Sequence, residues 1–204
     1  MTGIFINYRT GDETFAAPVI DERLRREFGD DRVFRDSRSL GPGLDFPPEI
    51  WYQLKRSTVL LALIGPRWLT LEDDSGNRRI DHPKDYVRRE IRRALKRDIR
   101  VIPLLLDGGR MPTEEELPHD IRRLARRQFL PLRTRDLLVD LQRLVDELAR
   151  IVPRSGQSPE SRTASAADPA TGPGSPANGR HSAVHITGDG QVFNGPITGG
   201  DSHG

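Results

Sequence analysis

Apolar runs and amphipathic stretches alternate along residues 1–152. Strands are predicted where apolar residues follow one another or alternate, over residues 4–8, 32–35, 58–64, 100–106 and 128–132. Helices are predicted where apolar residues recur every three or four positions, over residues 13–28, 47–55, 84–96, 121–127 and 134–151. This alternation is typical of a parallel sheet covered by helices on both faces. We therefore expect one α/β domain with a five-stranded, flavodoxin-like sheet.

Two of the predicted helices carry an apolar stripe that should face the sheet. In helix 13–28 the stripe consists of Phe15, Val19, Ile20 and Leu24. In helix 134–151 it consists of Leu137, Leu138, Leu141, Leu144, Val145 and Leu148. Pro18 fits the earlier helix only in its first turns, where its missing N–H costs no hydrogen bond.

The composition changes after residue 152. Residues 153–182 are rich in Pro, Gly, Ser, Ala and Thr, which predicts a disordered linker. Residues 183–204 regain apolar positions around a Gly-Asp-Gly turn, which predicts two short strands. This β-prone tail resembles the amyloid-type motifs at the ends of some bacterial signalling proteins, and the resemblance implies tail-mediated assembly with another signalling protein. An incidental, unstructured tail is the alternative, and Pro196 favours it.

Composition narrows the class of protein. The chain has 204 residues and no Cys, which excludes disulfides, thiolate zinc sites and Cys nucleophiles. Its longest apolar run, residues 59–64, is too short to span a bilayer. The first strand follows Met1 and Thr2 directly, which leaves no room for a signal peptide. We expect a cytoplasmic protein without a membrane partner.

The charges are nearly balanced, with 32 basic and 30 acidic residues and a net charge of +2. Most basic residues are Arg, and they cluster within residues 88–93 and 122–127. These positions alternate with apolar ones on predicted helices, as expected of solvated helix faces. No nucleic-acid motif or set of stacking aromatics accompanies them, so we expect no nucleic-acid partner.

Other α/β chemistries lack their motifs in this sequence. Neither Gly-x-Gly-x-x-Gly after the first strand nor Gly-Lys-Ser/Thr occurs, which excludes a dinucleotide-binding Rossmann domain and a P-loop. There is no Gly-x-Ser-x-Gly elbow, which argues against Ser-His-Asp catalysis. The central strand does not end in Asp, which argues against a receiver domain. His181 and His185 lie among glycines that disfavour a helical metal pair. We expect neither a metal site nor a prosthetic group.

Polar residues end the first predicted strand and follow the second. Asn-Tyr-Arg, which contains Tyr8 and Arg9, closes the first strand, and residues 33–36 lead into the loop 37–43. The carboxyl edge of an open α/β sheet is where its ligands bind. These segments resemble the first two sequence boxes of the Toll/interleukin-1 receptor (TIR) domain, which implies the TIR fold. Tyr8 and Arg9 look like the family residues that contact adenine or phosphate; the alternative is that they fix the corner between strand and helix.

Two further segments match the family. Asp36, Ser37 and Gly41 correspond to a mobile loop that, in relatives, covers the nucleotide cleft and makes contacts between domains. Residues 65–69 resemble the box after the central strand, in which we expect Trp68 to pack.

The segment with the most direct chemical implication is Tyr86–Glu90. Residues four apart on a helix share a face, and many TIR domains have Trp-x-x-x-Glu here, with Glu as the catalytic residue of those that cleave NAD. This chain has Tyr86 in place of Trp and keeps Glu90. One carboxylate can suffice, because nicotinamide leaves NAD as a neutral molecule and needs no acid. The structural alternatives are a surface ion pair between Glu90 and Arg93 and a packing role for Tyr86.

Three functions therefore stay open at the level of sequence. The first is a TIR-domain signalling or defence protein that cleaves NAD on self-association, with NAD as substrate rather than cofactor. The second is a non-catalytic adaptor that assembles with other TIR domains. The third is another Glu-dependent enzyme that cleaves the N-glycosidic bond of a nucleoside or nucleotide.

Overall fold

The computed structural model describes residues 2–12, 15–35 and 48–155. Except for residues 153–155, the predicted linker and the predicted β-prone tail lie outside these described residues. The predicted boundary of the domain at residue 152 therefore falls three residues before the described part ends.

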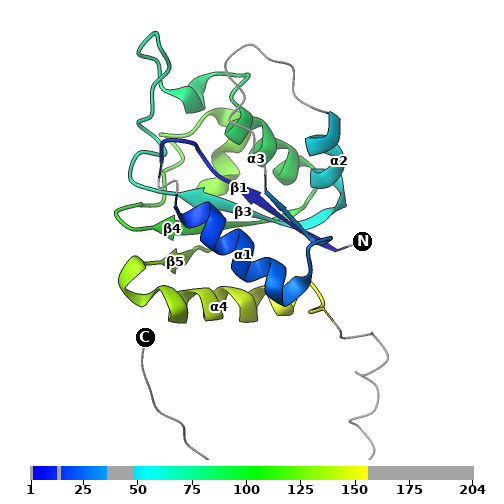
Figure 1. The fold of residues 1–204 in the computed structure, drawn as a ribbon. Helices are drawn as coiled ribbons and strands as arrows, with labels where there is room; N and C mark the ends of the chain where they lie inside the picture. Colours follow the sequence, from blue (N-terminus) through cyan, green and yellow to red (C-terminus); the bar gives the residue numbers. More distant parts are fainter. Residues whose placement is uncertain (1, 13–14, 36–47, 156–204) are drawn as a thin grey trace, which may run out of the picture. The chain divides into compact units, whose positions relative to one another are not determined.

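A single parallel sheet forms the centre of the described part of the chain (Figure 1). Its strands are β1 (Gly3–Asn7), β2 (Val33–Arg35), β3 (Ser57–Ile64), β4 (Arg100–Leu106) and β5 (Leu130–Leu132). They lie in the order β2-β1-β3-β4-β5, and every neighbouring pair is parallel. This confirms the flavodoxin-like sheet, and each predicted strand overlaps an observed one. The order reverses between β1 and β3, so their carboxyl ends form the topological switch point.

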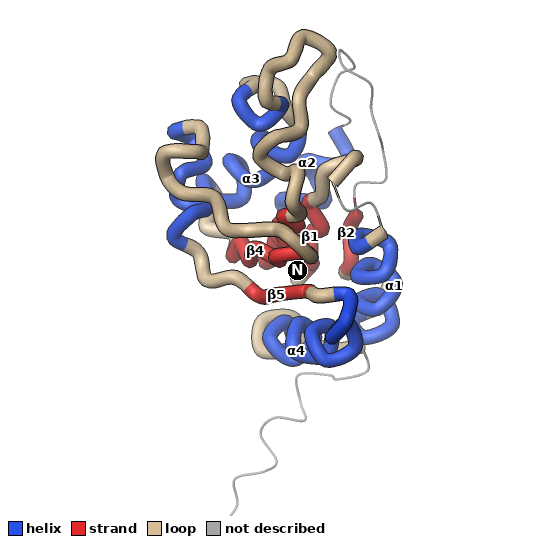
Figure 2. Tube along the Cα trace, turned by 90° about the vertical axis from the view of Figure 1, so that its left-hand side faces the viewer, coloured by secondary structure: helices blue, strands red, loops and turns tan. Residues whose placement is uncertain are grey.

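Helices cover both faces of the sheet (Figures 1 and 2). One face carries α1 (Ala16–Phe28) and α4 (Leu137–Ala149), and the other carries α2 (Pro48–Arg56) and α3 (Tyr86–Lys96). Alternate strand residues point to opposite faces: Ile4 and Ile6 of β1 pack with α1 and α4, whereas Phe5 packs with α2 and α3. Strand β3 is buried at nearly every position because both of its faces are covered.

The predicted apolar stripes of α1 and α4 are wrong in part. In α1, Phe15 precedes the helix and is 87% exposed, and Val19 is also exposed. The helix begins at Ala16, so its inward face is set by the spacing of Ala17, Ile20, Leu24 and Phe28, all of them buried. Pro18 falls within the first turn, as predicted. In α4, Leu138 is 83% exposed, and the first turn packs through Leu137 instead.

Short 3-10 helices replace part of the predicted α-helix. Residues 121–127 belong to η2 (His119–Arg126), whose two buried residues are Ile121 and Leu124. A spacing of three residues matches the period of a 3-10 helix better than that of an α-helix. The predicted helix 134–151 divides into η3 (Thr134–Asp136) and α4. A further 3-10 turn, η1 (Arg79–Asp81), lies in the polar segment before α3.

Candidate functional site

The loops that follow β1 and β3 are tied together by Asp12. Its carboxylate is 4% exposed and accepts hydrogen bonds from the backbone N–H groups of Gly65 and Arg67, at 2.9 and 2.8 Å. Gly65 allows this approach, because a Cβ at that position would lie 2.5 Å from an Asp12 carboxylate oxygen. Asp12 therefore fills the space between the two loops, at the point where a flavodoxin-like sheet usually receives its ligand.

Arg9 ties the end of β1 to the start of α3. It is 1% exposed, and its two terminal nitrogens donate to the two carboxylate oxygens of Asp85 at 2.8 and 3.0 Å. Asp85 is also the N-cap of α3, where it accepts a hydrogen bond from the backbone N–H of Arg88. The guanidinium lies 5.8 Å from the ring centre of Trp68, which is buried as predicted. In this geometry Arg9 is engaged with protein groups, which favours the corner-fixing role over a direct phosphate contact.

Asn7, the last residue of β1, holds the carboxylate of Glu90. The Asn7 side chain is fully buried, and its Nδ2 donates to Glu90 Oε2 at 2.6 Å and to the backbone oxygen of Val87 at 3.4 Å. Glu90 itself is 3% exposed. It therefore does not lie on a solvated helix face, where the alternative of a surface ion pair with Arg93 would place it. An anchored, desolvated carboxylate at the carboxyl end of a strand is suited to stabilising a positive charge.

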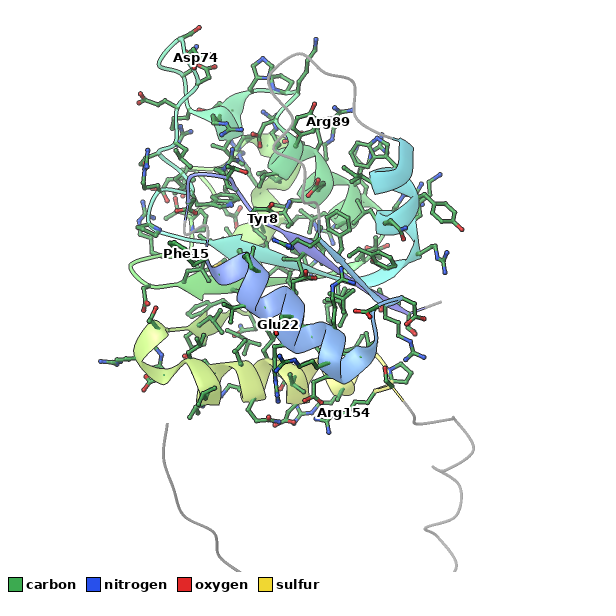
Figure 3. The ribbon with its side chains drawn as sticks, viewed as in Figure 1. Tyr8, Phe15, Glu22, Asp74, Arg89 and Arg154 are labelled. Carbon is green, nitrogen blue, oxygen red and sulfur yellow. The ribbon has the colours of Figure 1, made fainter. Side chains whose placement is uncertain are left out.

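The two tyrosines of the predicted site lie on different sides of β1. Tyr86, in the first turn of α3, is half-buried and one turn before Glu90. Tyr8 is also half-buried, but it packs against the cluster that joins the sheet to α1 and α4 (Figure 3). The structure thus brings Asn7, Arg9, Asp85 and Glu90 together and turns Tyr8 to the other face. Asp36, Ser37 and Gly41 lie outside the described residues.

Trp51 of α2 connects that helix to α3. The guanidinium of Arg93 lies 3.4 Å from the centre of the Trp51 ring, and that of Arg89 lies 5.3 Å from it. Burial lowers the pKa of Arg93, and the positive charges of Arg89, Arg92 and Arg97 lower it further. Figure 3 shows Arg89 on the side of α3 that faces α2.

Sequence reasoning assigned no site role to Asn7, Asp12, Asp85 or Trp51, although Asn7 belongs to the Asn-Tyr-Arg segment that it noted. Asp85 carried a usable signal, because Asp directly before a periodic segment is typical of an N-cap. Asn7 carried a weaker signal, as a polar residue at the end of an otherwise apolar strand. No local pattern indicates the contact between Asn7 and Glu90, which joins residues 83 positions apart.

Within the described ranges, no three His, Cys, Asp or Glu residues are grouped closely enough to hold a metal ion. Over the same residues, no helix combines the length and the apolar character needed to cross a bilayer.

Comparison with known proteins identifies the family. The model of the TIR domain family matches residues 4–145, well over half of the chain. Among solved structures, the chain is similar to the TIR domains of the activated Roq1 resistosome, which directly recognises the pathogen effector XopQ. The two share 12% sequence identity at a TM-score of 0.49, over 72% of this chain and 98% of the other. No curated protein matches the sequence. The family match shows that this chain belongs to the TIR domain family.

Proposed function

We propose that this TIR domain cleaves the bond between nicotinamide and ribose in NAD, as part of a signalling or defence response. The observation that carries the proposal is the environment of Glu90, whose buried carboxylate accepts a short hydrogen bond from Asn7 at the carboxyl end of β1. Burying a carboxylate in this way is costly, and such groups are concentrated at functional sites.

The chemistry requires little beyond this carboxylate. The bond between C1′ and the ring nitrogen breaks, and its electron pair neutralises the cationic nicotinamide. The ribose left behind is an oxocarbenium-like cation, which Glu90 stabilises electrostatically or traps as a nucleophile. Water then bonds to C1′ and loses a proton, which gives ADP-ribose; attack by an adenine nitrogen gives a cyclised product instead. Tyr86 supplies an aromatic face one turn away, suited to stacking on nicotinamide or ribose.

The experiment is to measure nicotinamide release from NAD by the purified full chain, beside Glu90→Gln. Glutamine keeps the shape of the side chain and an oxygen that can accept from Asn7, so the variant should fold. We expect a loss of roughly a hundredfold or more in rate. Glu22→Gln, at an exposed glutamate of α1 labelled in Figure 3, is the matched control and should keep the rate.

Two results would reject parts of this proposal, and a third would favour a different substrate. An unchanged rate in Glu90→Gln keeps an enzyme but discards Glu90 as its catalytic residue. No nicotinamide release from the wild-type chain, even when it is clustered by a fused oligomer, rejects the NAD-cleaving function. Faster release from nicotinamide riboside than from NAD favours the nucleoside enzyme.

Self-association is the second candidate function, and exposed apolar residues favour it. Phe15, Val19, Leu138 and Val139 are exposed, with values of 87, 39, 83 and 63%. They lie at the starts of α1 and α4, which contact each other and start on the same side of the molecule (Figure 1). Exposed apolar residues gathered on neighbouring elements often mark an interaction site. An adaptor would need only this surface, whereas an enzyme activated by clustering would use it together with Glu90.

A further inference from the structure

Arg9, the predicted phosphate ligand, already forms an ion pair with Asp85. Both of its terminal nitrogens are bound to Asp85, and its side chain is fully buried. If the substrate is a dinucleotide, its diphosphate needs a cation elsewhere near Glu90. The described residues offer such a cation on the same helix, one turn further along.

Arg93 differs from Arg88 and Arg92 on α3 in the kind of group that contacts its guanidinium. Arg88 and Arg92 share the carboxylate of Asp120, at 3.0 and 3.5 Å. Among the described residues, Arg93 makes no ion pair with a carboxylate and stacks on Trp51 instead. Its lowered pKa has two causes, loss of solvation and repulsion by neighbouring Arg residues. Both would be relieved by a bound anion.

The stack also gives Arg93 a suitable orientation. A guanidinium that lies flat on an indole is held in place and keeps the N–H groups at its edge available for two oxygens of one anion. Glu90 and Arg93 are three residues apart, so they lie on neighbouring positions of the same helix face, separated by about 4.5 Å of helix rise.

We propose that Arg93, held on Trp51, binds the diphosphate of a dinucleotide whose ribose lies at Glu90. The identity of this ligand rests on the proposed function, whereas the preference for a diphosphate anion rests on the contacts of Arg93. Trp51 acts as a positioning residue, because it fixes the guanidinium plane without touching the phosphate.

The first test measures binding of inorganic pyrophosphate to the full chain by isothermal titration calorimetry. We expect saturable binding by the wild type, and an affinity lower by roughly ten- to a hundredfold in Arg93→Gln. Arg97→Gln is the matched control: it removes an exposed charge one turn later on a residue outside the stack, and its affinity should be close to that of the wild type. Arg93→Lys keeps the charge without the planar fork and should fall between these two.

Two outcomes of the titration overturn the proposal. One is an absence of pyrophosphate binding by the folded wild-type chain. The other is equal weakening in Arg93→Gln and Arg97→Gln, which would indicate general attraction to a basic helix. Thermal unfolding of each variant verifies that a loss of binding is not a loss of folding.

The second test separates this site from the proposed reaction. In Arg93→Gln we expect the KM for NAD to rise about tenfold, with a smaller change in kcat, because the lost contact exists before the bond breaks. Hydrolysis of nicotinamide riboside, which has no phosphate, should not change. A wild-type chain that binds pyrophosphate but releases no nicotinamide refutes the NAD-cleaving function and keeps the anion site. Nicotinamide release by the wild type, with an unchanged KM in Arg93→Gln, keeps the NAD-cleaving function and refutes the anion site at Arg93.

Discussion

Asn7 and Glu90 join the end of β1 to α3 through one short hydrogen bond between buried side chains. The Asn7 amide donates to the Glu90 carboxylate and contributes to offsetting its desolvation, and both side chains are almost fully buried. Leaving a buried carboxylate without its donor costs its desolvation energy, whereas removing both partners costs much less.

We expect Asn7→Ala to lower the free energy of unfolding by about 2–3 kcal/mol, since it removes a short hydrogen bond to a buried carboxylate. Urea denaturation of Asn7→Ala, Glu90→Ala and the double variant forms a double-mutant cycle, because each single change removes the hydrogen bond between the two side chains. The two changes should be clearly non-additive. Additive effects would mean that the two side chains do not interact in solution.

The ion pair between Arg9 and Asp85 offers a second prediction. Removing one partner of a buried pair typically costs about 3–5 kcal/mol, because the other charge stays buried. We expect a loss of that size for Arg9→Ala in chemical denaturation. Arg26→Ala breaks an exposed pair with Glu22, where both side chains are about two-thirds exposed or more, and should change stability by less than about 1 kcal/mol. Similar losses in the two variants would contradict the structural role assigned to Arg9.

At the scale of elements, the sequence predicts where strands lie better than which helix face is buried. A buried parallel strand such as β3 is apolar throughout, and this pattern needs no knowledge of its neighbours. The face of α1, by contrast, depends on where the helix begins, and a start at Ala16 moves Phe15 and Val19 to solvent. The candidate site is harder still to predict from the sequence, because its contacts join the end of β1 to the start of α3 across 76 to 83 residues.

The junction between β5 and α4 is held by a buried carboxylate, which makes it sensitive to pH. Asp140 of α4 accepts hydrogen bonds from the backbone and the guanidinium of Arg133, which follows β5. The hydrogen bond from the Arg133 side chain lowers the pKa of Asp140 below its ordinary value of 3.8. The folded form therefore binds this proton more weakly than the unfolded chain does. The resulting stability is fully present above the unfolded pKa and is lost as the pH falls through the folded pKa.

Asp140→Asn should therefore lower stability at pH 7 by more than it does near pH 3. Urea midpoints measured from pH 2.5 to 7 test this, with Asp146→Asn, at a more exposed residue of α4, as the control. An equal effect of Asp140→Asn at both ends of this range would mean that the ion pair does not contribute through its charge.

For the molecule as a whole, the two candidate surfaces lie on opposite faces of the sheet. Glu90 and Arg93 belong to α3, whereas the exposed apolar residues belong to the starts of α1 and α4 (Figure 1). Chains that associate through α1 and α4 therefore leave α3 uncovered. The proposed assembly and the proposed nucleotide site are therefore compatible with each other, as the proposed activation by clustering requires.

This arrangement predicts that assembly and ligand binding can be changed separately. The double variant Phe15→Asp and Leu138→Asp places charges on the apolar surface and should reduce the apparent mass in sedimentation equilibrium, since like charges oppose the burial of that surface. The proposed activation by clustering predicts that nicotinamide release per chain rises with protein concentration, and the double variant should lose this rise. Pyrophosphate affinity should stay the same, because Arg93 lies on the other face. Tyr52→Asp, which changes an exposed aromatic residue of α2, should leave the mass unaltered. The opposite result, in which Tyr52→Asp reduces the mass and the double variant does not, would assign assembly to the face that carries α2. Assembly on that face would compete with the ligand.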